Sequence, residues 1–93
     1  MTSLYVVCYD IIDDRLRARI SKKMLDYGTR IQDSVFECLL DAAGKARLVR
    51  QIEEFPLADE DKIRLYRICA KCVEEVCIYG AGSLTRDPDF YLV

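Results

Sequence analysis

The chain contains no histidine, and this absence excludes more than any other feature of its composition. Without an imidazole there is no histidine general base, no histidine-activated serine or cysteine nucleophile, and no histidine metal ligand. Long apolar runs are also missing, because the longest spans only a few residues, far short of the ~20 that a membrane helix needs. Enzymes built on histidine and proteins that cross a membrane as helices are therefore excluded.

Neither length nor charge points to a function class. The 93 residues suffice for one domain with one modest core. Hydrophobic residues make up 52% and charged residues 32% of the chain, which is typical of a globular protein and not of a disordered one. The formal net charge is −2, so only a local cluster of basic residues could bind nucleic acid.

The first four residues lack the pattern of a signal peptide, and we expect a cytoplasmic protein without membrane contact.

Five cysteines in a chain without an export signal are expected to stay reduced. Cys8 and Cys38 lie inside apolar strand patterns and are predicted to be small core residues. The spacing Cys69-x-x-Cys72, followed by Cys77, raises the question of a metal or redox site. A structural zinc site needs four ligands, and no second pair or histidine exists here. A thioredoxin-type pair would open a helix after a strand, whereas another strand is expected here, so we predict structural cysteines.

The hydrophobic pattern predicts strands at residues 4–9, 30–40, 62–69 and 76–79, and helices at residues 13–28 and 41–56. Asp13 and Asp41 are suited to cap the two helices, and Gly28 and Pro56 are suited to end them. We assign these elements to the α+β ferredoxin-like plan, βαββαβ, with a four-stranded antiparallel sheet. Two right-handed crossovers would place both helices on one face of that sheet.

The other face of the sheet should be wet and show polar residues in alternation. Residues 4–9 do not alternate, because each of them is apolar or aromatic. A second copy of the chain, packed sheet against sheet, would cover this face, although a few exposed apolar atoms are normal on any surface. We expect a homodimer of ferredoxin-like domains at residues 1–82. A tail at residues 83–93 would pack as a strand at the dimer or partner interface, with a frayed terminus as the alternative.

Two features could carry chemistry. Asp10 closes the first strand just before the first helix, where ligands commonly bind in open α/β sheets. Its carboxylate either caps a turn or binds a hard cation such as Mg²⁺ or Mn²⁺, which a two-fold axis could place between two copies. The second feature is the first helix, where Arg15 and Arg19 share a face that Lys22 and Lys23 extend. This face either contacts phosphates or is merely solvated.

Several motifs resemble the CRISPR-associated protein two family, the small subunit of the spacer-integration machinery in antiviral defence. The opening Tyr5-Val6-Val7-Cys8-Tyr9-Asp10-Ile11 carries the resemblance, together with residues 13–19, 27–32, 34–38, 63–66 and 87–90. The resemblance implies a homodimer that binds duplex DNA and bridges the CRISPR integrase subunit during spacer acquisition. It also implies a Mg²⁺-dependent or Mn²⁺-dependent endonuclease that acts on single-stranded RNA or duplex DNA.

Carried over by position, Asp10 would be the catalytic and metal-binding residue at the dimer two-fold. The residues that would line or support the same cleft are Tyr9, Arg17, Arg19, Arg30 and Phe36. Nucleic acid would be bound by Arg15, Arg17, Arg19, Lys22 and Lys23. Two other functions remain open, namely a stand-alone toxin-like endoribonuclease and a non-catalytic structural adaptor.

Overall fold

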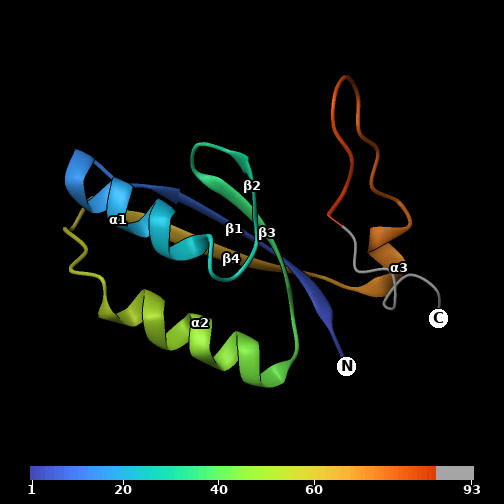
Figure 1. Ribbon diagram of the computed structural model, residues 1–93, viewed down its shortest axis with the longest axis horizontal. Helices are drawn as coiled ribbons and strands as arrows, with labels where there is room; N and C mark the ends of the chain where they lie inside the picture. The colour runs from blue at the N-terminus through green and yellow to red at the C-terminus, as the bar shows by residue number, and fades with distance from the viewer. Residues whose placement is uncertain (86–93) are drawn as a thin grey trace.

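The computed structural model describes residues 1–85 and has the element order βαββαβ followed by one short helix (Figure 1). The elements are β1 (Ser3–Asp10), α1 (Asp14–Met24), β2 (Thr29–Gln32), β3 (Val35–Leu40), α2 (Ala42–Glu54), β4 (Lys62–Ile68) and α3 (Ala70–Val73). This is the ferredoxin-like α+β arrangement that the sequence predicts. Within the described residues, no helix is long and apolar enough to cross a membrane.

The sheet has the strand order β2-β3-β1-β4, and every neighbouring pair is antiparallel. The central strand β1 pairs with β3 on one side and β4 on the other, so that Val7 lies between Phe36 and Leu65. Side chains alternate between the two faces of a strand, and directly paired residues share a face. The register therefore assigns each residue of the three strands to one of two faces.

Both helices pack on the same face of the sheet, as predicted. The sheet supplies the buried side chains of Tyr5, Val7, Tyr9, Phe36, Cys38 and Leu40. The helices supply Leu16, Ile20 and Met24 from α1 and Leu48 from α2. These apolar side chains recur at helical spacing in α1, and their burial is the main driving force that holds the helices on the sheet.

The predicted helix caps are confirmed. Asp13 Oδ2 accepts a hydrogen bond from the Leu16 amide at 2.7 Å, and Asp41 Oδ1 accepts one from the Gly44 amide at the same distance. Each carboxylate satisfies an amide that the helix itself leaves unpaired. Gly28 serves a different purpose from the predicted helix stop, since α1 already ends at Met24. A Cβ atom at Gly28 would lie 2.3 Å from the Glu37 carbonyl oxygen, so only glycine permits this close approach.

The predicted strand at residues 30–40 is wrong, because this segment forms a hairpin of β2 and β3. Asp33 and Ser34 make the turn between them. Polar residues of this kind favour turns, and they separate exposed β2 from β3, whose residues are alternately buried and half-buried. The β2–β3 hairpin supplies the two consecutive strands that the βαββαβ plan requires.

The predicted strand at residues 76–79 is also wrong, since the chain there has no regular structure. The short helix α3 follows β4 directly, at the end of β1 near the N-terminus (Figure 1). Val76, Ile78 and Tyr79 are exposed, Tyr79 to 90%. An apolar run forms a strand only where a neighbouring strand can pair with it, and within the described residues none pairs with this segment. The strand predicted for the tail at residues 83–93 lies outside the described residues from residue 86 onward.

The face of the sheet opposite α1 and α2 is here called the open face. By register it carries Leu4, Val6, Cys8, Val35, Glu37, Leu39, Arg64, Tyr66 and Ile68. Leu4 is buried, most of the other apolar side chains are only half-buried, and Tyr66 is 45% exposed. The amide of Thr85 donates to Glu37 Oε1 at 2.9 Å, so the described end of the chain touches this face. A partly apolar surface remains there.

Candidate metal and nucleic-acid site

Asp10 is the last residue of β1, and its side chain is exposed. It lies opposite Lys62, the first residue of β4, in the strand register. Alternation along β1 places Asp10 on the open face and Tyr9 on the face that the helices cover. Asp10 is therefore a solvent-accessible carboxylate at the edge of a partly apolar surface.

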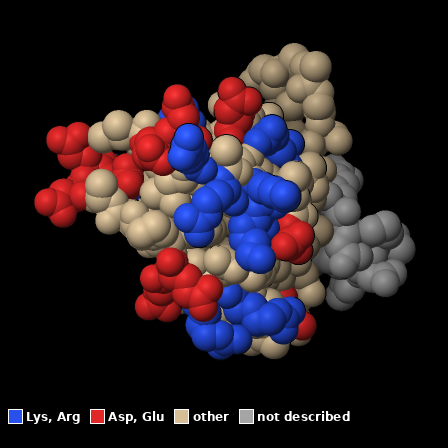
Figure 2. Space-filling view, turned by 60° about the vertical axis from the view of Figure 1, so that its left-hand side comes forward, with Lys and Arg blue, Asp and Glu red and all other residues tan. Residues whose placement is uncertain are grey.

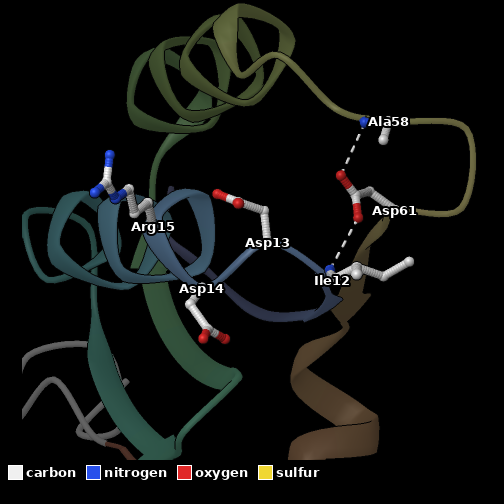
Figure 3. A pocket seen from close by; sticks show the side chains of 6 residues that line it. All are labelled: Ile12, Asp13, Asp14, Arg15, Ala58 and Asp61. Carbon is white, nitrogen blue, oxygen red and sulfur yellow. Dashed lines mark hydrogen bonds between the residues drawn. The ribbon is translucent and has the colours of Figure 1, made fainter.

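The turn that follows Asp10 is held by side chains from two other segments. Arg17 Nη1, from α1, donates to the Ile11 carbonyl oxygen at 2.7 Å, and the same guanidinium pairs with Asp14. Asp61, from the segment between α2 and β4, accepts from the Ile12 amide at 3.0 Å and from the Ala58 amide at 2.8 Å (Figure 3). These bonds fix the backbone on the C-terminal side of Asp10.

An open pocket beside this turn is lined by Ile12, Asp13, Asp14, Arg15, Ala58 and Asp61 (Figure 3). Its three carboxylates do not form one site, because each has a structural partner. Asp13 caps α1, Asp14 pairs with Arg17, and Asp61 accepts from two backbone amides. Asp13 and Asp14 also point in opposite directions in Figure 3. The pocket thus supports the turn after Asp10 and offers no shared carboxylate cluster.

The role of Asp61 was missed in the sequence. The acidic run at residues 59–61 indicates a turn. Because all three residues are acidic, the sequence does not show which of them makes a specific contact. Only the folded chain shows that Asp61 reaches across to the Ile12 amide, 49 residues away. No spacing rule in the sequence could have identified this contact.

The residues present fit a divalent metal only in part. A carboxylate such as Asp10 is the donor that Mg²⁺ and Mn²⁺ prefer. Within residues 1–85, however, no group of three or more potential ligands lies close enough together to hold a metal ion. A metal site at Asp10 therefore needs further donors from a second copy or from the substrate.

Tyr9, Arg30 and Phe36 are brought together with one another but lie on the face opposite Asp10. The rings of Tyr9 and Phe36 are stacked, with centroids 6.4 Å apart, and both side chains are buried. The Arg30 guanidinium lies 5.8 Å from the centre of the Phe36 ring and donates to the Ser21 hydroxyl. The Tyr9 hydroxyl donates to the carbonyl oxygen of Asp33 at 3.1 Å. Tyr9 and Phe36 therefore support the end of β1 from inside the fold, and Arg30 covers the Phe36 ring from the exposed strand β2.

The basic residues predicted to bind nucleic acid fall into two groups. Arg15, Arg19, Lys22 and Lys23 are exposed on α1, whereas Arg17 is engaged with Ile11 and Asp14. Helix α2 adds three exposed basic side chains that the sequence analysis did not single out, at Lys45, Arg47 and Arg50. Their position within one predicted helix could have identified them in the sequence as a second basic group. Figure 2 shows Lys and Arg side chains gathered in two neighbouring groups on one side of the molecule.

A family model described as CRISPR associated protein Cas2 matches residues 2–76. The chain belongs to the Cas2 family. It is 39% identical to CRISPR-associated endoribonuclease Cas2 3 of Chloroflexus aurantiacus over 93 residues, which is 100% of both chains. It is 36% identical to the Synechocystis protein CRISPR-associated endoribonuclease Cas2 3 over 90 residues, covering 97% of this chain and 98% of that one.

Solved structures agree with this membership. The Thermus thermophilus hypothetical protein TT1823 has a TM-score of 0.77 and 35% identity, covering 90% of this chain and 98% of its own. A chain of a partial Cas6-RT-Cas1–Cas2 complex has a TM-score of 0.67 and 28% identity, covering 82% of this chain and 89% of its own. The Cas2 fold thus extends over most of the chain.

Proposed function

We propose that this Cas2-family chain acts in the cytoplasm during CRISPR spacer acquisition. It would do so as a homodimer that binds duplex DNA, bridges the integrase subunits and has a metal-dependent endonuclease activity. The names of the two Cas2 relatives support the nuclease, because both are called endoribonucleases. The complex that contains Cas1 and a Cas2 chain of this fold supports assembly with an integrase.

The observation that carries the catalytic part of the proposal is the placement of Asp10. Its carboxylate is exposed at the end of β1, and the turn behind it is held by Arg17 and Asp61. An accessible carboxylate next to a well-held turn is a suitable donor for a divalent ion on the protein side. The bonds from Arg17 and Asp61 hold the backbone in place, which reduces the reorganisation that binding would require.

A dimer through the open face would bring two copies of Asp10 toward a common axis. The half-buried apolar side chains of Val6, Cys8 and Val35 are candidates for the contact, because they leave water when two sheets pack together. Such an interface is isologous, so its two-fold axis relates the two copies of Asp10, and the proposed metal site requires both to lie close to that axis. A Mg²⁺ or Mn²⁺ ion held there would supply Lewis-acid activation of a phosphodiester and ionisation of a water molecule.

The substitution Asp10→Asn tests this proposal. It keeps the size of the side chain and removes its charge, so we expect loss of cleavage of single-stranded RNA and duplex DNA with an unchanged fold and oligomeric state. Asp26→Asn is the matched control, since Asp26 is also exposed but lies in the turn after α1. Cleavage by the wild type should require added Mg²⁺ or Mn²⁺ and should stop on chelation.

Three outcomes would replace the proposal. If Asp10→Asn cleaves at the wild-type rate, Asp10 is not catalytic. If neither protein cleaves any substrate while both bind DNA and Cas1, the chain is a structural adaptor. If the wild type cleaves RNA but binds neither duplex DNA nor Cas1, it is a stand-alone endoribonuclease. Gel-based cleavage and size-exclusion chromatography with purified Cas1 distinguish these results.

A further inference from the structure

The pair Cys69 and Cys72 stands where a strand ends and a helix begins. β4 ends at Ile68, Cys69 is the N-cap of α3, and Cys72 is the third residue of that helix. This arrangement corrects the sequence analysis, which expected a further strand after the pair and therefore excluded a redox motif. A strand–Cys-x-x-Cys–helix order is instead the setting in which dithiol pairs react.

The local geometry brings the two thiols together. The Cys72 amide donates to Cys69 Sγ at 3.4 Å, which closes the first turn of α3. A disulfide needs Cβ atoms about 3.5–4.5 Å apart, closer than the ~5–6 Å between residues three apart on a helix surface. Cys69 is the N-cap with an extended backbone (φ −67°, ψ 160°), so the pair closes through a backbone adjustment at this residue, outside the helix itself. Both residues are free cysteines, Cys69 half-buried and Cys72 exposed. Small thiol reagents can therefore reach the pair.

The two thiols differ in acidity. Hydrogen bonds from the Cys72 amide and the Cys72 thiol lower the pKa of Cys69, and the positive charge of Arg67 contributes further. The same sulfur contact raises the pKa of Cys72. Cys69 is therefore the better attacking thiolate, and Cys72 keeps its proton longer. A reactive dithiol pair needs this asymmetry, with one attacking and one resolving residue.

The other cysteines of the described chain lack this combination. Cys38 is fully buried, and Cys8 lies half-buried on the open face. Cys77 is exposed, but its thiol donates to the carbonyl oxygen of Glu75 and it joins no metal-binding group with the pair. The pair therefore differs from the three remaining cysteines in both geometry and access.

We propose that Cys69 and Cys72 form a reversible redox-active dithiol pair, a modification site at the junction of β4 and α3. The Cys69 thiolate attacks one sulfur of a small disulfide such as oxidised glutathione, forms a mixed disulfide and releases one glutathione thiolate. Cys72 then loses its proton to solvent and attacks the Cys69 sulfur, which releases the second glutathione thiolate. The protein is oxidised by two electrons, and the small disulfide is reduced to two thiols.

The disulfide would fix the first turn of α3, the helix that follows β4. Val73, the next residue, is buried, and α3 packs against β1. Oxidation would therefore hold this packing more firmly and restrict the segment that follows at residues 74–85. Hydrogen exchange of the amides in α3 should be slower in the oxidised protein.

The test uses the full chain equilibrated with mixtures of reduced and oxidised glutathione, trapped by alkylation and analysed by peptide mass spectrometry. The wild type should carry a Cys69–Cys72 disulfide that reduced glutathione removes. Cys72→Ser should instead retain glutathione on Cys69, because the resolving thiol is missing. Cys77→Ser is the matched control and should form the same disulfide as the wild type. Circular dichroism of each variant checks that the fold is retained.

The proposal is overturned by any of three results. The first is a wild type that forms no disulfide at any glutathione ratio. The second is a disulfide that links Cys69 or Cys72 to another cysteine. The third is a Cys72→Ser variant in which glutathione accumulates on Cys69 no faster than on Cys77. None of these results depends on nuclease activity, DNA binding or assembly with Cas1.

Discussion

At the scale of single residues, burial changes the chemistry of Cys38. Its side chain lies in the core between sheet and helices with no exposed surface. This burial, with a smaller contribution from the charge of Glu37, raises the pKa of the thiol from 9.0 to about 11. Cys38 thus acts as a small apolar core residue, as its place in an apolar strand pattern predicts.

The raised pKa of Cys38 predicts a loss of stability at alkaline pH. Between pH 9.0 and about 11 the folded chain keeps the Cys38 proton while the unfolded chain loses it. The folded state then binds more protons, so the free energy of unfolding falls as pH rises through this range, and the full contribution is present only below it. Urea unfolding of the wild type should therefore show a steeper fall in stability over this range than that of Cys38→Ala. Parallel pH profiles would contradict the prediction.

At the scale of elements, α1 combines a buried apolar stripe with an exposed basic face. Leu16, Ile20 and Met24 pack on the sheet, while most of its Arg and Lys residues point to solvent. Arg17 is the exception, because its guanidinium ties the start of α1 to the end of β1. One helix thereby anchors the turn after Asp10 and presents a charged surface.

The exposed face of α1 is expected to contact DNA phosphates. The triple substitution Arg15→Ala, Arg19→Ala and Lys22→Ala should weaken binding to duplex DNA of any sequence. It should also flatten the salt dependence, by about 0.9 in the log–log slope for each phosphate interaction that the substitutions remove. Alanine favours helix, so the fold should persist. Fluorescence anisotropy at several salt concentrations measures the slope.

The control for this prediction is the corresponding triple substitution on α2, Lys45→Ala, Arg47→Ala and Arg50→Ala. It removes the same number of charges from a neighbouring exposed helix. A slope that changes only in the α2 variant would assign the phosphate contacts to α2. A slope that changes in neither would mean that both faces are merely solvated.

At the scale of the whole molecule, the two faces of the sheet differ. One is covered by α1 and α2, and the other, the open face, keeps half-buried apolar side chains around β1. Tyr66 is 45% exposed there, lies opposite Val6 in the register and accepts a hydrogen bond from Arg64 at 3.1 Å. A partner that covers this face would remove apolar surface from water.

We expect Tyr66→Glu to convert a dimer into a monomer. The side chain is exposed in the single chain, so the substitution should cost little folding stability but would place an unpaired charge in a sheet-on-sheet interface. Leu25→Glu is the control, because Leu25 is 58% exposed at the end of α1 and away from the open face. Sedimentation equilibrium should show a monomer for the first variant and a dimer for the second. A wild type that is monomeric at micromolar concentration would refute the proposed interface.

Local features of the fold could be predicted from the sequence. The strand at residues 4–9 agrees with β1 to within one residue at each end, and Asp13 and Asp41 cap the helices as expected. Apolar periodicity and cap chemistry act within one or two helical turns, so the sequence reveals them directly. The predicted strands at residues 30–40 and 76–79 were wrong for the opposite reason, because strand pairing depends on distant neighbours.

Part of the candidate site could likewise be predicted from the sequence, and part could not. The sequence by itself determined that no histidine chemistry is available, that Asp10 follows the first strand, and that basic residues share one face of α1, because these depend only on composition and spacing. Only the tertiary structure decided that Tyr9 and Phe36 are buried on the face opposite Asp10, that Asp61 reaches Ile12, and that Cys69 caps a helix. Each of these depends on contacts between segments far apart in the chain or on where a strand stops, and local pattern does not encode either.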